Sequence, residues 1–412
     1  MTFQPTPEFA QSMTAADPLA ALRERFYFPK STDGAECTYL CGHSLGLQPK
    51  TARAYIEREM KDWELLGVAG HFRACHPWVT YSKLLTEQTA RLVGALPSEV
   101  VVMNSLTVNL HLMMVSFYRP TLERHKIVIE ENAFPSDQYA VKSQIQFHGF
   151  DPEESLIAVA GEEELQALLD QQGDAVALIL LGGVNYSSGR AFDLAGVARA
   201  GHAKGCVVGF DLAHAAGNVI LKLHDWDADF AVWCTYKYLN GGPGSIAGCF
   251  VHERHAREDL PRFAGWWGHD PETRFRMGPE FHATPDAEGW QVSNPSIVSL
   301  AALRAAMDVM DEAGMERLRA KSMLLTGYLE LLLGRHADRG FSIITPSDPE
   351  RRGAQLSIRV GPNVHAMCDR LATEGVVCDW REPDILRVAP APLYNSFSDV
   401  YRFVERFAAA LD

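Results

Sequence analysis

The chain has 412 residues, 47% of them hydrophobic and 22% charged, which is the composition of a globular protein long enough to bury a large core in two lobes. Its formal net charge of -14 argues against a nucleic-acid partner or an anionic membrane surface. No apolar run approaches the roughly 20 residues of a membrane span, and the first residues do not resemble a secretion signal. We therefore expect a cytoplasmic protein.

The N-terminal segment, residues 1–50, is expected to pack with the small domain at the other end of the chain. Cys37, Cys41 and His43 lie close enough in this segment to suggest zinc ligands. No fourth ligand follows at the spacing of known zinc sites, so we expect no metal there. The eight cysteines form no CxxC pair, and several lie in or beside apolar runs, as free thiols do in a reducing compartment.

Between residues 51 and 295, short β-rich runs alternate with segments of helical periodicity. Such alternation predicts an α/β domain with a mostly parallel sheet and helices on both of its faces. A ligand of this kind of sheet lies beyond the carboxyl ends of the strands. The predicted strands are residues 126–130, 155–160, 175–184, 206–211 and 229–234, and the clearest helical segments are residues 162–170 and 193–205.

The last part of the chain, residues 296–412, has a different character. From Ser296 to Arg335 it is nearly continuous in helix formers, with apolar residues three and four apart, which predicts one long helix. Strand-like runs and a final amphipathic helix follow, so we expect a smaller α+β domain joined by that helix. The strand-like runs are residues 342–347, 353–360, 375–380 and 385–390.

Two ionisable residues follow neighbouring apolar strands of the predicted sheet. Asp211 ends the run 206–211, and Lys237 comes shortly after the run 229–234. A pyridoxal phosphate site needs this pair: the lysine amine binds the cofactor aldehyde, and the aspartate keeps the ring nitrogen protonated. The aromatic residues around Lys237 remove its hydration, which lowers the pKa of the amine and makes it a nucleophile.

Each of these residues also has an ordinary interpretation. A lysine stem often packs under aromatic rings with its ammonium in water, and an aspartate between a strand and a helix is often an N-cap. The two together, with His214 one helical turn after Asp211 and glycines following Lys237, favour the cofactor site.

Distinctive motifs occur along nearly the whole chain: YLCGHSLGLQPK, MNSLTVNLHLMM, AFPSDQYA, FDLAHAAGN, WCTYKYLNGGPG, GWWGH, SNPS and RVAPAPLYNS. Together they resemble those of kynureninases, a family of fold-type I pyridoxal phosphate enzymes in the class V aminotransferase-like group. The resemblance implies hydrolytic Cβ–Cγ cleavage of L-kynurenine, or of its 3-hydroxy form, to anthranilate or 3-hydroxyanthranilate and L-alanine, in tryptophan catabolism and by a homodimer.

The resemblance assigns roles to individual residues. Lys237 removes the substrate Cα proton, Asp211 holds the ring nitrogen, Asp137 orients groups near the ring, and Tyr236 is the general acid and base, through a phenol whose pKa its surroundings can lower. The helix that starts near Leu106 suits the cofactor phosphate, although its start could equally be a routine N-cap. The implied cofactor-binding residues are Leu106, Thr107, Phe134, Pro135, Ser136, Asp137, Asp211, His214, Tyr236, Lys237, Trp266 and Asn294, with Trp266 and Asn294 reaching across from a neighbouring subunit.

Substrate binding is expected to depend on Arg387, which interrupts an apolar strand and so needs an anion partner. The α-carboxylate of a substrate would supply that partner in a bidentate pair, and a buried ion pair with a protein carboxylate is the alternative. By resemblance the substrate-binding residues are Ser44, His71, Ser293, Asn294 and Arg387.

The sequence departs from the family pattern at two positions. His43 stands where the family more often has asparagine, and Gly182 stands where serine is common, which leaves the preference between kynurenine and 3-hydroxykynurenine open. A cysteine desulfurase or an aminotransferase shares the Asp and Lys arrangement, but a desulfurase usually has a histidine where Tyr236 stands. A catalytically silent cofactor-binding protein could dispense with Arg387 or Tyr236, and both are present.

Overall fold

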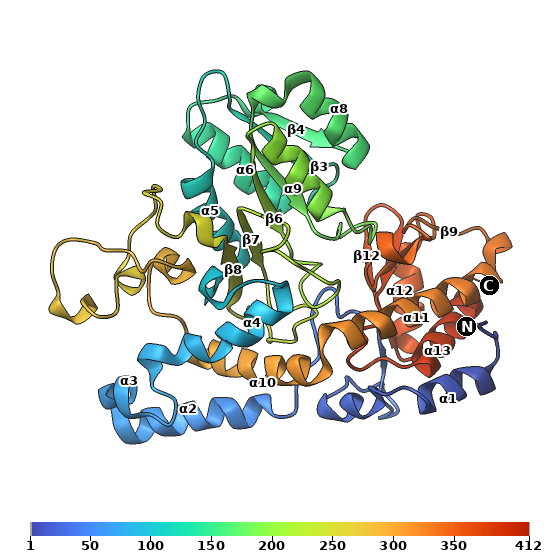
Figure 1. The fold of residues 1–412 in the computed structure, drawn as a ribbon. Helices are drawn as coiled ribbons and strands as arrows, with labels where there is room; N and C mark the ends of the chain where they lie inside the picture. The colour runs from blue at the N-terminus through green and yellow to red at the C-terminus, as the bar shows by residue number, and fades with distance from the viewer. Residues whose placement is uncertain (1, 412) are drawn as a thin grey trace.

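A central sheet of seven strands organises the computed structural model, which describes residues 2–411. Five neighbouring strands run parallel, and β8 runs antiparallel to both of its neighbours. The mostly parallel α/β sheet predicted from the sequence is therefore confirmed (Figure 1). The order across the sheet is β2 (Val100–Met103), β8 (Ala247–Val251), β7 (Phe230–Trp233), β6 (Val207–Asp211), β5 (Val176–Gly182), β3 (Lys126–Glu130) and β4 (Leu156–Val159).

Helices cover both faces of this sheet because its strands are apolar on both sides. Along β5, Leu178 and Leu180 belong to one core, whereas Ile179 and Leu181 belong to the other, as the two-residue period of a strand requires. The first core includes α5 (Leu106–Phe117) and α6 (Pro135–Phe147). The second includes α4 (Thr86–Val93), α8 (Glu162–Gln172), α9 (Leu194–Ala203) and α10 (Ile297–Ala313).

The single long helix predicted after Pro295 is wrong, because the chain turns at Gly314. That glycine has a φ of 74°, and it separates α10 from α11 (Met315–Gly334). A positive φ is readily adopted by glycine and ends a helix, which composition and periodicity alone do not reveal.

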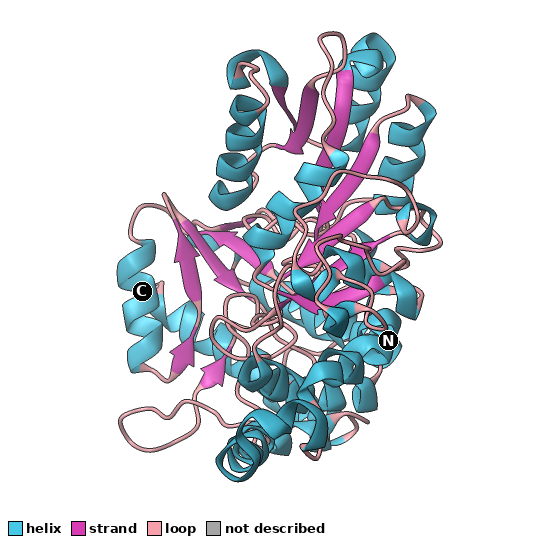
Figure 2. Cartoon of the chain, turned by 90° about the vertical axis from the view of Figure 1, so that its left-hand side faces the viewer, coloured by secondary structure: helices cyan, strands magenta, loops and turns pink. Residues whose placement is uncertain are grey.

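The C-terminal lobe is built on a second, antiparallel sheet in the order β12 (Asp379–Arg381), β13 (Ile385–Val388), β10 (Leu356–Arg359) and β9 (Ser342–Ile343). Figures 1 and 2 show this lobe beside the large sheet, with both chain ends near it in Figure 1. It has its own hydrophobic core, which includes residues of α11 and, from the start of the chain, Ala10 and Leu40. This separate core supports a distinct C-terminal lobe, whereas α10 and the N-terminal residues Leu22 and Phe26 belong to a core of the large sheet. The division into residues 1–50, 51–295 and 296–412 stays a proposal. The remaining elements of the lobe are α1 (Pro7–Ala15), β1 (Thr38–Tyr39), α12 (Val364–Thr373), β11 (Val376–Val377) and α13 (Phe397–Ala410).

The helices α2 (Ala52–Leu66) and α3 (Gly70–Arg73) lie below the large sheet on the left of Figure 1. The loop-rich segment around residues 256–296 extends on the same side of the molecule. The short helix α7 (Pro152–Ser155) leads into β4. Among residues 2–411, no helix combines the length and the hydrophobicity needed to cross a membrane.

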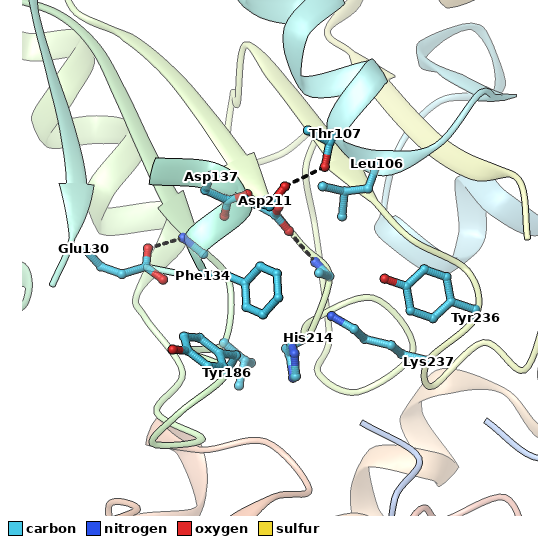
Figure 3. Close-up of a pocket in the computed structure, with 14 residues that line it drawn as sticks. Leu106, Thr107, Glu130, Phe134, Asp137, Tyr186, Asp211, His214, Tyr236 and Lys237 are labelled. Atoms are coloured by element: carbon cyan, nitrogen blue, oxygen red, sulfur yellow. Dashed lines mark hydrogen bonds between the residues drawn. The ribbon is translucent and has the colours of Figure 1, made fainter. Parts of the chain in front are cut away.

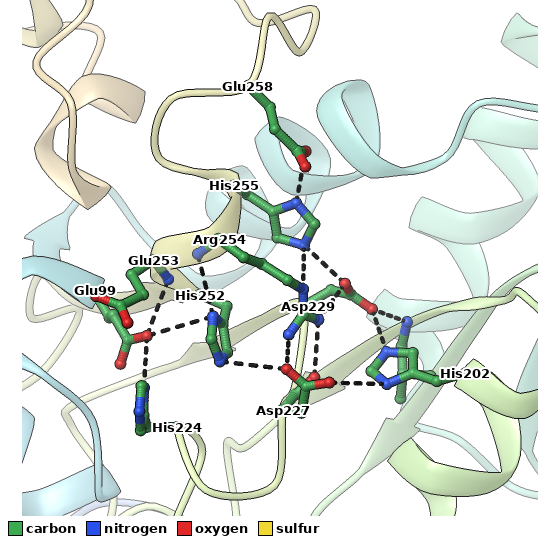
Figure 4. Close-up of polar contacts among 11 residues, drawn as sticks. Glu99, His202, His224, Asp227, Asp229, His252, Glu253, Arg254, His255 and Glu258 are labelled. Carbon is green, nitrogen blue, oxygen red and sulfur yellow. Dashed lines mark hydrogen bonds and ion pairs between the residues drawn. The ribbon is translucent and has the colours of Figure 1, made fainter.

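A buried network of ionic side chains holds the amino end of β7, opposite to the end that leads to Lys237 (Figure 4). Asp229 Oδ2 accepts hydrogen bonds from the Val208 amide of β6 at 2.6 Å and from His202 Nε2 at 2.9 Å. Its Oδ1 accepts one from Arg254 Nη2 at 2.6 Å. Although burial opposes ionisation, hydrogen bonds from groups that include His202 and His255 hold the pKa of Asp229 well below its ordinary value.

Glu99, His224 and His252, in the same network, lie close enough together to hold a metal ion. Their facing atoms already have partners, however. Glu99 Oε1 accepts from the Glu253 amide at 2.9 Å and lies 2.9 Å from His224 Nδ1, and His252 Nδ1 accepts from the Arg254 amide at 3.2 Å. We interpret the cluster as a structural hydrogen-bond network.

We predict that Asp229→Asn destabilises the protein by about 1–3 kcal/mol at pH 7, because the partly buried His202, Arg254 and His255 lose the negative charge that they share. The measurement is urea denaturation followed by circular dichroism, with Asp225→Asn as the exposed control. Because the folded pKa of Asp229 is lowered, its stabilisation is present above the unfolded pKa of about 4 and fades as the pH falls below it. Equal stability of the two variants at pH 7 would refute this role.

Candidate active site

Most of the predicted cofactor residues line one pocket at the carboxyl ends of the central strands (Figure 3). The residues that line this pocket come from the ends of β3, β5 and β6, from the segment after β7, and from the first turns of α5 and α6. This is the position at which open α/β sheets bind ligands. The residues that line the pocket are Leu106, Thr107, Glu130, Phe134, Ser136, Asp137, Gly182, Val184, Tyr186, Asp211, Ala213, His214, Tyr236 and Lys237.

Two carboxyl groups meet in this pocket, that of the buried Asp211 and that of the partly buried Asp137. Asp211 is the last residue of β6, and its Oδ1 accepts a hydrogen bond from the Ala213 amide at 2.8 Å. Burial raises the pKa of both groups, and the negative charge of Asp211 raises that of Asp137 further. A cation placed against the pair would relieve both effects, and a protonated pyridine nitrogen is such a cation. The pair therefore fits pyridoxal phosphate.

Lys237 reaches the same pocket from the segment after β7. Its Nζ lies 6.0 Å from the centre of the Phe134 ring and 5.8 Å from that of Tyr236. Phe134 leaves 46% of its surface exposed, so one ring face is available for stacking on a planar ligand. Burial, followed by the positive charge of Lys237, holds the pKa of His214 well below its ordinary value, so this imidazole is neutral at pH 7.

The amino end of α5 provides an anion site. Its N-cap residue, Ser105, makes no side-chain hydrogen bond to the first turn, so the amides of this turn are not capped in that way. Thr107 Oγ1 and Ser136 Oγ lie 2.8 Å apart beside it and add two hydroxyl donors. Uncapped amides at a helix start, together with hydroxyl groups, suit a phosphate.

Tyr236 lines the pocket as predicted, but the expected direction of its pKa is wrong. Burial raises the pKa of its phenol, and the neighbouring Cys234 raises it further. The phenol is therefore protonated at neutral pH and can donate a proton or a hydrogen bond.

Glu130 is a pocket residue that the sequence analysis missed, although it is the last residue of a correctly predicted strand. Its Oε2 accepts a hydrogen bond from the Gly182 amide at 2.5 Å, and burial raises its pKa to about 7. A Cβ at position 182 would lie 2.7 Å from Glu130 Oε1. The Glu130 carboxyl therefore occupies the space that a side chain at position 182, such as the serine expected from the family pattern, would need. Val184, Tyr186 and Ala213 were also missed.

Arg387 is fully buried on β13 and pairs with a protein carboxylate. Its Nε and Nη2 donate to Asp379 at 2.8 and 2.5 Å, and its Nη1 donates to the Tyr186 carbonyl at 2.8 Å. The buried ion pair that we considered as an alternative is therefore present. Tyr186 connects this arginine to the pocket, because its ring packs edge-on against Phe134 at 5.2 Å.

The other predicted site residues do not line the pocket of a single chain. Pro135 is the first residue of α6, and Ser44 lies in the turn after Cys41. His71 lies on α3 and packs edge-on against Trp78. Ser293 and Asn294 are exposed, and Trp266 leaves 46% of its surface exposed.

Large apolar side chains are exposed on the same side of the chain as Trp266. Phe72, near the end of α3, contacts Phe275, which also packs edge-on against Trp266. Exposed aromatic groups gathered in this way are typical of a protein–protein contact. The exposed residues of this region are Trp63, Val68, Phe72, Phe263, Trp266, Phe275 and Met277.

Solved structures with this fold belong to pyridoxal phosphate enzymes. The chain superposes on a C-DES mutant with glycine covalently linked to the PLP cofactor, with a TM-score of 0.78 and 16% identity over 94% of this chain and 98% of that chain. It also superposes on the cysteine desulfurase CsdA from Escherichia coli, with a TM-score of 0.77 and 18% identity over 100% and 99% of the two chains. The fold is that of the fold-type I PLP-dependent enzymes.

Relatives of higher identity define the family. The kynureninase of Koribacter versatilis (strain Ellin345) is 65% identical over 419 residues, covering 100% of this chain and 99% of its own. That of Myxococcus xanthus (strain DK1622) is 58% identical, covering 98% and 97%. Residues 318–407 match the family described as the kynureninase C-terminal domain. The chain belongs to the kynureninase family.

We predict that Gly182→Ala destabilises the protein by about 1–3 kcal/mol, because the added methyl group displaces the buried Glu130 carboxyl. Urea denaturation measures this effect, and Gly278→Ala is the control, since a Cβ there meets nothing within 4 Å. The double variant Gly182→Ala/Glu130→Ala should lose less stability than the sum of the two single variants. Strict additivity would show that the two residues do not compete for space.

Proposed function

We propose that this chain is a pyridoxal phosphate enzyme that hydrolyses the Cβ–Cγ bond of L-kynurenine to give anthranilate and L-alanine. The observation that carries this proposal is the placement of Lys237 and the Asp137–Asp211 pair in one pocket of a chain that is 65% identical to a kynureninase. A desulfurase or aminotransferase activity is less well supported, because the desulfurase similarity is one of fold at 18% identity.

The residues of the pocket divide the work of holding the cofactor. Asp211, with Asp137 beside it, would keep the ring nitrogen of the cofactor protonated, and Phe134 would pack against the ring. The first turn of α5, with the Thr107 and Ser136 hydroxyls, receives the phosphate. When bound, the cofactor supplies an electron sink for the electron pair left at the substrate Cα.

Other groups bind the substrate and move its protons. The amine of Lys237 would hold the cofactor through its aldehyde, and it would act as the general base for the Cα proton of the substrate. The protonated phenol of Tyr236 is placed to give a proton during bond cleavage. Arg387 binds the substrate α-carboxylate through donors that Asp379 does not use.

The working unit that we propose is a homodimer. The exposed aromatic surface around Trp266 supports it, since a second copy would cover this surface. The exposed positions of Asn294 and Ser293, and the half-buried position of His71, are consistent with contributing to the active site of the partner. Eight free cysteines support a reducing, cytoplasmic location, and the reaction suggests a place in tryptophan catabolism.

We predict that Lys237→Ala abolishes the absorbance band of the covalently linked cofactor and lowers kcat by about 10²–10⁴-fold or more, because the chain loses both the amine and the general base. The spectrum of the purified variant with added cofactor and an anthranilate fluorescence assay measure the two effects. Lys222→Ala, at an exposed lysine, is the control. Retention of the band in Lys237→Ala would exclude this lysine from its role.

A complementation experiment tests the shared site. Lys237→Ala and Asn294→Ala should each be nearly inactive as pure dimers, whereas mixed dimers regain one intact site. Random exchange should then restore about a quarter of the wild-type rate. Lys237→Ala and Asp211→Ala should not complement each other, because both residues of a given site come from the same chain. Failure of the first mixture despite proven subunit exchange would contradict a site built from two chains.

A further inference from the structure

Asp379, on β12, is the centre of a buried cluster next to the active-site pocket. It pairs with Arg387 at 2.8 and 2.5 Å, lies 3.3 Å from Arg381 Nη1, and lies 2.9 Å from His43 Nε2. Arg387 exposes 1% of its surface and His43 none. The cluster joins the N-terminal segment, the C-terminal sheet and, through the Tyr186 carbonyl, the pocket.

The ion pair leaves Arg387 able to bind a second carboxylate. A guanidinium carries five N–H donors. Asp379 takes one from Nε and one from Nη2, and the Tyr186 carbonyl takes one from Nη1. The two remaining donors, one on each terminal nitrogen, have no partner among the described residues, and a carboxylate that reached both would form a bidentate pair.

The charges of the cluster also favour a second anion. Arg381 and Arg387 bring two positive charges, and Asp379 brings one negative charge. Burial, and then the positive charge of Arg387, lowers the pKa of His43 to about 4, so His43 is neutral at pH 7. One unit of positive charge is therefore unmatched within the cluster, and a substrate carboxylate at the free edge of Arg387 would balance it.

The contact of His43 with Asp379 assigns the imidazole hydrogens. Because Asp379 is an acceptor, the Nε2 of the neutral ring carries the hydrogen and donates it. His43 Nδ1 has no hydrogen-bond partner among the described residues, so the bond to Asp379 is the polar contact that orients this ring. An asparagine amide at this position could donate in the same way.

We infer that Asp379, held by His43, is a positioning residue that fixes Arg387 with its free edge toward the substrate α-carboxylate. This inference rests on the proposed function, in which Arg387 is the carboxylate anchor. Asp379 itself touches neither the substrate nor the cofactor in this arrangement. Its effect is therefore on substrate binding and not on the chemical steps.

The test compares steady-state kinetics of the holoenzyme variants with L-kynurenine. Asp379→Asn should raise KM about tenfold or more, because a neutral amide cannot accept both Arg387 donors as a carboxylate does, and should leave kcat within about threefold. His43→Leu should raise KM in the same direction, and His43→Asn should restore most of the wild-type KM. Glu382→Gln is the matched control, because Glu382 is an exposed carboxylate in the turn directly after β12.

The Arg387→Met variant distinguishes a failure of the anchor role of Arg387 from a failure of the positioning role of Asp379. If Arg387→Met leaves KM unchanged, the anchor assignment of the proposed function fails. If Arg387→Met raises KM but folded Asp379→Asn does not, the positioning role of Asp379 is overturned. If Asp379→Asn does not fold, the His43 pair decides, and an equal KM for His43→Leu and wild type overturns the inference. The double variant Asp379→Asn/Arg387→Met should bind substrate no worse than Arg387→Met alone.

Discussion

Two buried carboxyl groups that need a positive charge between them are the constraint on which this active site depends. Asp211 and Asp137 come from different elements, the end of β6 and the first turn of α6, and each is largely removed from water. Carboxyl groups in such a place either take up protons or face a cation. A protonated pyridine nitrogen would satisfy them, which is the basis of our proposal that the cofactor ring binds beside this pair.

The parallel strands of the large sheet bring other pocket residues next to these two carboxyl groups. Because β3, β5, β6 and β7 are parallel, their carboxyl ends bring Glu130, Gly182 and Asp211 to one edge, and the segment after β7 brings Lys237. The opposite end of β7 is held by the Asp229 network, which ties β7 to β6. The C-terminal lobe then adds Arg387 at the border of the pocket, through the Tyr186 carbonyl.

Much of this arrangement could be predicted from the sequence because it follows from local patterns. The strands before Asp211 and Lys237 are apolar runs with clear ends, and the family motifs assign roles to the residues that follow them. Tertiary contacts were not predictable in the same way. The contact of Asp379 with His43 joins segments far apart in the chain, the raised pKa of Tyr236 depends on burial, and the helix break depends on the φ of Gly314. Glu130 had a signal, its place at a strand end, that we did not use.

The central claim is that this pocket cleaves a carbon–carbon bond in kynurenine. The most direct measurement is to incubate the PLP-loaded protein with L-kynurenine and to quantify anthranilate by fluorescence and L-alanine by chromatography. We expect the two products to form in equal amounts as kynurenine is consumed. Bound cofactor without cleavage of either kynurenine or 3-hydroxykynurenine would contradict it.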